Sequence, residues 1–402
     1  MSRNGDSWVF ALTVMSAAAV LVSIAGAETL LAVAFLSWIV LRRKSIVWPS
    51  YFVPLAAFMA TTAVSLAMSP QPEVGMSAVR KFVLFTMGLL AANLITTTAR
   101  ARIVIAVLLG IASITSLYGL FQFRAAYVHY LSTQQLGDDP MVLARIKGTM
   151  GHWMTFSGEQ LLVWCAAIPA MVILGRRWLI PLGIVGTALV FSFTRSVWLG
   201  AIGGLLAIAL LMPRRILIAS ILPVALVGAA ASGLIYHRLS FSFQQKQEFT
   251  PDSGRFKLIS GGIRMIKAHP LFGVGPERIH TEFPRYYGGT DLPTYYGHLE
   301  NNIVQLAAER GLLCLAAFLW FVFELYGSFF EMLKTSPPET RWVVLSALAA
   351  LTGFIMSGFG SYNFGDSEVL LLLLFIVSLP YGVTQSVRAE EPYARTLVSV
   401  QS

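Results

Sequence analysis

An arginine between two apolar runs is the first residue whose position indicates chemistry. Arg195 lies in the stretch Phe193–Trp198, and an apolar run stands on each side of it. Arginine stays charged and binds phosphate oxygens in a bidentate manner, and it is costly at a membrane surface unless it is paired or hydrated. Arg195 therefore predicts an anion site for a lipid-linked phosphate or diphosphate. The alternative is an anchor whose guanidinium reaches the lipid headgroups.

A histidine begins a polar stripe that leads into a later apolar run. His298, Asn302, Gln305 and Glu309 follow a spacing of i, i+4, i+7 and i+11, which predicts one face of a helix. Polar stripes inside a membrane usually face a bundle interior or a hydrated cavity. An imidazole titrates near neutral pH and can act as a general base, so His298 is the candidate base. For Asn302 and Gln305 the alternative is hydrogen bonding between helices.

A basic amphipathic helix is predicted to open at Ser253–Arg255, with Asp252 or Ser253 as its cap, because the apolar and basic residues that follow separate on a helical wheel. This helix should end at His269–Pro270, since proline disfavours helix in the preceding residue. It would lie on the membrane or roof a cavity, and the alternative is an interfacial helix without chemistry. Its apolar positions are Phe256, Ile259, Ile263 and Ile266, and its basic positions are Lys257, Arg264 and Lys267.

Three further groups of residues could support such a site. Arg145 and Lys147 could steer a lipid diphosphate by their charge. His152 and Trp153 stand beside glycines, so a ligand could approach the backbone and a sugar could stack on the indole, although an interfacial tryptophan is the commoner case. Asp366 lies near the predicted outer end of the last apolar run and could orient an arginine or the histidine, although loop acids are more often simply solvated.

The composition shows what kind of protein must position these residues. Of the 402 residues, 56% are hydrophobic and 12% are charged, whereas a soluble protein carries about 25% charged residues. This excludes an ordinary soluble enzyme, a disordered protein and a nucleic-acid-binding domain. Because the apolar runs are continuous rather than alternating, the predicted fold class is an all-α integral membrane protein. Cys165 and Cys314 lie inside apolar runs, which argues against a disulfide framework, and no metal-ligand spacing is present.

About twelve apolar runs approach the length of a transmembrane helix, which needs about 20 residues. Basic residues follow every second run, and the positive-inside rule then places these junctions and both termini in the cytoplasm. We expect helices 1–9 within residues 1–236, a periplasmic segment with the amphipathic helix at 237–299, helices 10–12 within 300–388, and a cytoplasmic tail at 389–402. Between the fifth and sixth helices, Phe123–Thr155 is expected to form a loop on the outer side. The runs start near Trp8, Glu28, Tyr51, Phe82, Ile103, Phe156, Trp178, Val197, Ile216, Asn301, Trp342 and Glu368, and the basic junctions include Arg42, Arg100, Arg176, Arg214 and Lys334.

The sequence lacks the motifs that hold nucleotides. There is no Gly-x-x-x-x-Gly-Lys-Ser/Thr loop for ATP and no Asp-x-Asp pair to hold a metal on a nucleotide sugar. The residues that could do chemistry gather on the predicted outer side, where nucleotides are scarce. A group transfer there needs a donor with its own leaving group, such as a polyprenyl diphosphate. We therefore predict no cofactor and no metal site.

Three stretches, in this order, resemble the signatures of a known family. Phe193–Gly200 resembles a Ser/Thr-Arg-x-x-Trp/Phe signature, and Ser253–Gly275 resembles an "Arg … Asn-Pro-Leu-Phe-Gly-Val-Gly" segment. His298–Leu312 resembles a "His-x-His-Asn … Glu-x-Gly" helix start. Together they resemble the O-antigen ligase and O-antigen polymerase superfamily of membrane glycosyltransferases.

This resemblance implies a GT-C-like enzyme of the bacterial inner membrane that uses undecaprenyl-diphosphate-linked glycans at the periplasmic face. It implies that Arg195 and Arg255 bind the donor diphosphate and that His298 activates the acceptor hydroxyl. The family often has a second histidine where this chain has Glu300. Glu300 is therefore the alternative base.

These observations predict a metal-independent, inverting transfer of a glycan from undecaprenyl diphosphate to lipid A–core, as an O-antigen ligase performs in lipopolysaccharide biosynthesis. An O-antigen polymerase and a protein O-oligosaccharyltransferase are alternatives that share the donor and differ in the acceptor. The alternative of another class is a secondary transporter. Ionisable residues that gather at one face argue against it, with Glu324 as the exception.

Overall fold

The structure is a computed structural model that describes residues 3–42, 45–133, 145–236, 251–288 and 296–401. No strand occurs within these ranges, and their regular structure is helical throughout. The predicted all-α fold class is therefore confirmed at this level, whereas the GT-C assignment stays a prediction. The predicted start of the periplasmic segment, residue 237, lies outside the described residues, and the other domain boundaries stay predictions.

The helices follow one another along the chain with short connections. In order they are α1 Arg3–Ala19, α2 Ile24–Leu41, α3 Phe52–Ala67, α4 Met76–Arg80, η1 Lys81–Phe85, α5 Thr86–Leu94, α6 Thr98–Thr133, α8 Trp153–Leu174, η2 Arg176–Trp178, α9 Leu179–Phe191, α10 Arg195–Ile208, α11 Arg214–Ala230, α13 Pro251–Ala268, α14 Ile279–Tyr287, α15 Asn302–Thr335, α16 Pro338–Gly358, η3 Asn363–Gly365 and α17 Ser367–Gln401.

All twelve predicted apolar runs are helical, as expected for a chain whose backbone groups must be satisfied internally in lipid. Seven helices in the described ranges are long and apolar enough to cross a membrane. The chain is therefore a multi-pass membrane protein, and the total of twelve spans stays a prediction. The seven are α2, α4–α5, α6, α8, α15, α16 and the part of α17 up to Gln385.

Helix α16 lies at the centre of the bundle and packs on α8, α10, α15 and α17. Glycines permit the closest of these approaches. A Cβ on Gly204 of α10 would lie 2.8 Å from the carbonyl oxygen of Ala349 in α16, and one on Gly200 would lie 2.5 Å from that of Gly353. Small residues at such positions let membrane helices pack by backbone contact. The start of α10, where Arg195 lies, is thereby held against the core of the bundle.

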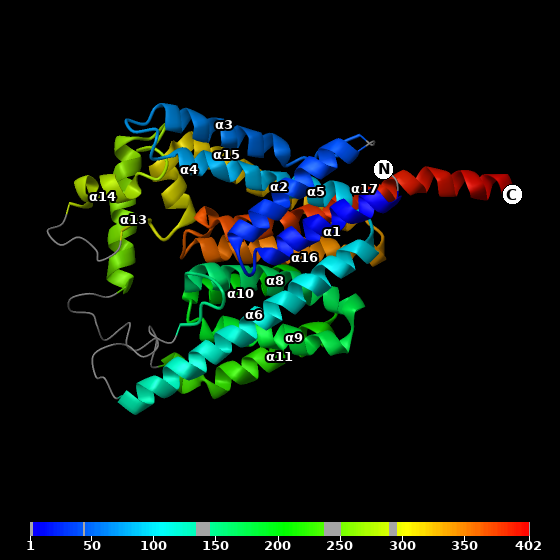
Figure 1. Cartoon of the computed structure of the whole chain (residues 1–402), viewed down its shortest axis with the longest axis horizontal. Helices are drawn as coiled ribbons and strands as arrows, with labels where there is room; N and C mark the ends of the chain where they lie inside the picture. The colour runs from blue at the N-terminus through cyan, green and yellow to red at the C-terminus, as the bar shows by residue number, and fades with distance from the viewer. Residues whose placement is uncertain (1–2, 43–44, 134–144, 237–250, 289–295, 402) are drawn as a thin grey trace.

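Two helices cap one end of this bundle (Figure 1). The long helices run roughly alongside one another, whereas α13 crosses them at the end where α14 also lies. The chain termini lie toward the opposite end. We refer to the first as the α13 end. The predicted amphipathic helix is confirmed as α13 and ends one residue before His269, whereas α14 was not predicted.

Two predictions about local structure were wrong. Residues 123–133 were expected in a loop, but α6 continues to Thr133. The polar stripe was expected to begin at His298, but α15 begins at Asn302 and leaves His298 in the preceding loop. Helix α15 also breaks at Gly311, whose φ of 85° and ψ of 171° are not helical. The polar segment Asn302–Arg310 is thus separate from the apolar remainder.

Candidate active site

A carboxylate links the candidate base to one candidate phosphate ligand. Oε1 of Glu300 lies 3.4 Å from Nδ1 of His298, and Oε2 lies 3.8 Å from Nη2 of Arg255. The Glu300 side chain is largely buried, whereas His298 and Arg255 remain partly exposed. The Nδ1 side of the imidazole therefore faces an anion, which orients the ring.

The backbone of this loop is held in an unusual conformation. Glu300 has a φ of 52°, a left-handed value that costs a residue with a side chain about 1–2 kcal/mol. Its neighbours hold it there, because the backbone N–H of Leu299 donates to Gln305 over 2.8 Å and Asn301 caps the first turn of α15. Strained residues of this kind concentrate at functional sites. The conformation turns the Glu300 carboxylate toward both His298 and Arg255.

A buried network behind the loop anchors Gln305. Gln305 donates to a carboxylate oxygen of Glu309, and Glu309 accepts from Nε of Arg310 over 3.1 Å. All three side chains are buried. The predicted polar face of Asn302, Gln305 and Glu309 is thus confirmed as interior, although Gln305 and Glu309 support the loop rather than face a substrate.

His298 lines a small cavity at the α13 end, with a volume of about 40 Å³. A cavity of this size holds a few water molecules and excludes a sugar ring. A ligand as large as a sugar ring would therefore contact this cavity from outside. Its polar lining comes from four parts of the chain and comprises His152, Thr194, Ser196, His298, Ser357, Ser361, Tyr362, Asn363 and Asp366.

The loop between α16 and α17 forms one wall of this cavity, and sequence reasoning found only Asp366 in it. Asn302 holds this wall in place. Its Nδ2 donates to Oδ1 of Asn363 over 2.6 Å, and its Oδ1 accepts from the backbone N–H of Phe364 over 3.2 Å. Asn302 is therefore a positioning residue. Tyr362 and Asn363 stand between glycines in a polar stretch between two apolar runs, which was the available signal.

Arg195 is the first residue of α10, and the residues on both sides of it, Thr194 and Ser196, line the cavity. Gly360 connects this position to the second arginine. A Cβ on Gly360 would lie 3.0 Å from Cβ of Ser196 and 3.9 Å from Nη1 of Arg255. The two sequence segments that carry the predicted diphosphate ligands thus meet around one glycine.

A stack of cationic and aromatic groups lies at another edge of the cavity. The ring of His152 lies 4.0 Å from that of Trp153, and the guanidinium of Arg145 lies 4.9 Å from the Trp153 ring. Nδ1 of His152 accepts from the backbone N–H of Met154. Burial is the largest cause that lowers the pKa of His152, and electrostatic interaction with His298 and Arg145 lowers it further. A neutral His152 would carry its proton on Nε2. Lys147 is exposed.

Asp366 faces the same cavity in an environment that disfavours its charge. The hydroxyl of Thr155 donates to its Oδ2 over 3.4 Å. Burial, followed by the nearby carboxylate of Glu368, raises the pKa of Asp366 to about 7. Perturbed carboxyl groups in clefts are typical of functional sites. Asp366 can therefore exchange a proton near neutral pH within the cavity that holds His298.

The glycine-rich turn after α13, residues 270–276, forms backbone hydrogen bonds with α15 on both sides of its break. The backbone N–H groups of Val274 and Gly275 donate to the carbonyls of Ala308 and Glu309 over 3.0 and 2.9 Å, and the N–H of Leu312 donates to the carbonyl of Pro270 over 2.8 Å. These bonds satisfy backbone groups that the break at Gly311 leaves without helical partners. The turn therefore locks α13, which carries Arg255, to the helix that follows His298.

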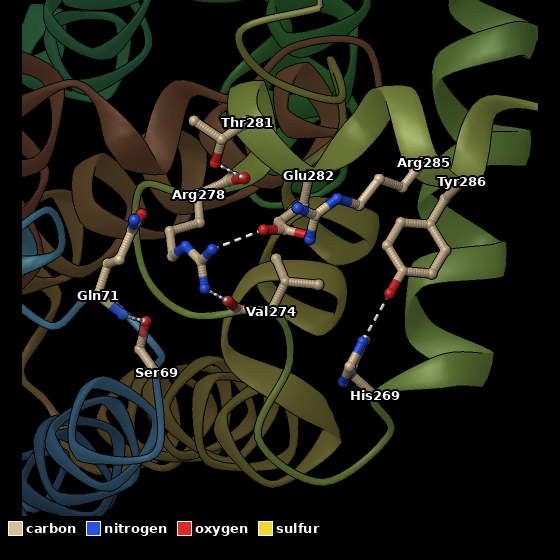
Figure 2. A network of polar contacts seen from close by, with 9 residues as sticks. All are labelled: Ser69, Gln71, His269, Val274, Arg278, Thr281, Glu282, Arg285 and Tyr286. Atoms are coloured by element: carbon tan, nitrogen blue, oxygen red, sulfur yellow. Dashed lines mark hydrogen bonds and ion pairs between the residues drawn. The ribbon is translucent and has the colours of Figure 1, made fainter.

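A second polar network fixes α14 to this turn (Figure 2). Arg278 donates to Glu282 over 2.6 Å and to the carbonyl of Val274 over 3.3 Å, and Arg285 donates to the other oxygen of Glu282 over 2.8 Å. Arg278 and Glu282 are both buried. Removing one partner of a buried ion pair leaves an uncompensated charge. Loss of Arg278 or Glu282 should therefore release α14 from the turn that contains Val274.

Part of the chain matches a known family. Residues 180–319 match the family model described as O-antigen ligase. The matched stretch contains Arg195, Arg255 and His298 and extends from α9 into α15. The match confirms the resemblance to the O-antigen ligase and polymerase superfamily, whose members are glycosyltransferase-like membrane enzymes. No curated protein matches the chain.

Proposed function

We propose that this member of the O-antigen ligase and polymerase superfamily transfers a glycan from a polyprenyl diphosphate to an acceptor hydroxyl. One observation carries the proposal: Glu300 joins His298 and Arg255 at the rim of a cavity that the start of α10 also borders. A base and two diphosphate ligands are what a glycosyl transfer with a diphosphate leaving group requires. Undecaprenyl diphosphate is the proposed carrier.

His298 is the proposed general base. Its Nδ1 faces Glu300, so Nε2 can accept the proton of the acceptor hydroxyl as that oxygen attacks the anomeric carbon. A general base contributes about 10²–10⁴-fold to the rate. Glu300 contacts both His298 and Arg255, which supports a positioning role for it rather than that of the base.

Arg195 and Arg255 are the proposed ligands of the leaving group. As the new C–O bond forms, the bond from the anomeric carbon to the diphosphate oxygen breaks, and its electron pair leaves with the diphosphate. Preorganised guanidinium groups stabilise the charge that develops there. Attack from the face opposite the diphosphate inverts the anomeric configuration. The proposed scheme is metal-independent, because the two arginines stabilise the leaving group.

The proposed orientation places the α13 end in the periplasm of a bacterium, at its inner membrane. Arg42, Arg100, Arg176 and Lys334 belong to the junctions that the positive-inside rule assigns to the cytoplasm. In this orientation the candidate active site opens toward the periplasm, and both termini are cytoplasmic. A labelling reagent that does not cross the membrane should therefore modify Thr281→Cys in α14 and spare Lys334→Cys in intact spheroplasts, since both positions are exposed.

Lipid A–core is the proposed acceptor, which would make the enzyme an O-antigen ligase. The support is that α13 and α14 belong to a single long segment between α11 and α15, which contain the ninth and tenth predicted apolar runs. An O-antigen polymerase would instead use a second lipid-linked repeat, and a protein O-oligosaccharyltransferase would use serine or threonine.

The deciding experiment supplies a defined undecaprenyl-diphosphate glycan to purified protein in nanodiscs, together with lipid A–core, a second lipid-linked repeat or a peptide. Modified lipid A–core with release of undecaprenyl diphosphate is the expected result. Modification of another acceptor would assign the alternative activity. Absence of any transfer, combined with uptake of a solute into proteoliposomes, would favour a transporter. The His298→Gln variant is the matched control for enzyme-dependent release.

A further inference from the structure

Helix α13 presents three different faces, and only one of them is accounted for by the fold. The buried face contains Leu258, Gly261, Gly262 and Met265. The glycines permit close packing, because a Cβ on Gly262 would lie 2.6 Å from the side chain of Val304 in α15. This face holds α13 on α14 and α15 and leaves the rest of its circumference open.

The open part of α13 carries two parallel stripes. Phe256 and Ile263 are 76% and 43% exposed and lie on an apolar stripe at helical spacing. Lys257, Arg264 and Lys267 form a basic stripe beside it and are all exposed. Arg264 donates to Ser260, and Lys257 lies over the ring of Tyr287. In the described ranges none of these three cations forms an ion pair with a carboxylate.

The C-terminal end of α13 lies at the level where the lipid-facing surface begins. The turn that follows α13 bonds to α15, since Leu312 donates to the carbonyl of Pro270. Leu271 in this turn is 55% exposed, and Leu312 and Leu313 at the start of the apolar part of α15 are 44% and 47% exposed. The apolar stripe of α13 thus leads to a surface of α15 that bilayer lipid must cover. In Figure 1, α13 runs across the bundle, as a helix in the plane of the membrane surface would.

We propose that α13 binds anionic lipids of the surrounding leaflet along its length. The apolar stripe lies against the upper part of the acyl chains, and Lys257, Arg264 and Lys267 bind the headgroup phosphates. An apolar stripe next to a basic one matches an anionic lipid in both shape and charge. The occupant is membrane lipid rather than a soluble anion, because a soluble anion would leave the apolar stripe uncovered.

This binding would regulate the site if the proposed function holds. Arg255 is on the same helix and faces Glu300. Lipids that hold the open faces of α13 therefore also hold Arg255 relative to His298. We expect transfer to be faster in nanodiscs that contain phosphatidylglycerol than in pure phosphatidylcholine. This consequence depends on the proposed function, whereas the lipid binding itself does not.

The test places a fluorophore on the apolar stripe. A bimane is attached to Phe256→Cys, since the native Cys165 and Cys314 are both buried. The full-length protein is placed in nanodiscs that contain equal fractions of phosphatidylglycerol and phosphatidylcholine, with one or the other brominated. We expect quenching by both lipids and a larger effect from brominated phosphatidylglycerol. A triple variant should remove this preference; it carries Lys257→Gln, Arg264→Gln and Lys267→Gln. Three surface cations can raise the binding of anionic lipid at least about tenfold.

A matched control removes three exposed cations from the other end of the bundle. Arg176→Gln, Arg177→Gln and Lys334→Gln together should leave the preference for phosphatidylglycerol unchanged. Absence of quenching by either brominated lipid would show that α13 stands off the membrane. Equal quenching by both lipids, or a preference that survives loss of the basic stripe, would overturn the anionic-lipid site. Because fluorescence is the readout, these outcomes are independent of whether transfer occurs.

Discussion

The carboxylate of Glu300 lies 3.4 Å from the imidazole of His298 and belongs to a residue with left-handed backbone geometry. This relationship makes orientation of the base testable. Glu300→Gln keeps the shape and removes the charge, so we expect kcat to fall by about 100-fold, the size of effect that a misplaced catalytic group produces. The variant His298→Gln should lose more activity than Glu300→Gln, because it removes the base itself. A larger loss in Glu300→Gln than in His298→Gln would instead identify Glu300 as the base.

Arg255→Lys tests whether the leaving group needs a fork of donors. Lysine keeps the charge and cannot contact two oxygens in a bidentate manner. We expect kcat/KM for the donor to fall by about 10²-fold. The control is Lys257→Gln on the same helix, assayed in detergent without anionic lipid, and it should stay within about twofold of wild type. Full activity of Arg255→Lys would exclude a bidentate contact.

Asp366 predicts a specific dependence of stability on pH. Because its pKa is raised from 3.8 to about 7, the folded state binds a proton that the unfolded state has released between these pH values. The stabilisation is therefore present below pH 3.8 and is lost as the pH rises to about 7, with a slope of up to about 1.4 kcal/mol per pH unit. Thermal unfolding in detergent should show this loss, and Asp366→Asn should not. Identical slopes in both proteins would contradict the raised pKa.

Gly311→Ala tests the break in α15. A Cβ at this position would collide with the carbonyl of Leu271, and the φ of 85° is strained for alanine. We expect a loss of stability of at least about 1–2 kcal/mol, measured as a lower Tm, together with loss of transfer because His298 and Arg255 are no longer aligned. Gly327→Ala on the same helix has open space around it and should be neutral or slightly stabilising.

Metal independence is tested by chelation. The proposed scheme assigns charge stabilisation to Arg195 and Arg255, so activity should persist after dialysis against EDTA. Restoration of a lost activity by added Mg²⁺ or Mn²⁺ would require a different mechanism. Elemental analysis of the purified protein provides the complementary measurement.

Much of the helical architecture could be predicted because it depends on local signals. An apolar run of sufficient length has to be helical in lipid, and the pattern around Arg255 separates on a helical wheel whatever lies next to it. For the same reason His269–Pro270 correctly predicted where α13 ends. The order of Arg195, Arg255 and His298 along the chain was likewise enough to identify the family that residues 180–319 match.

The positions of side chains relative to one another could not be read in this way. The sequence placed His298 on a helix, but capping by Asn301 starts α15 after it. Nor did any local pattern show that the glycine-rich turn after α13 bonds to the backbone on both sides of the break at Gly311.

The sequence by itself determined that this chain is a helical membrane protein with arginines and a histidine at one predicted face. Only the tertiary structure decided that Glu300 joins His298 to Arg255 and that the loop containing Tyr362 and Asn363 completes the cavity. The physical reason is that hydropathy and periodicity act over neighbouring residues. A contact between segments remote in the chain depends on how every helix in between packs.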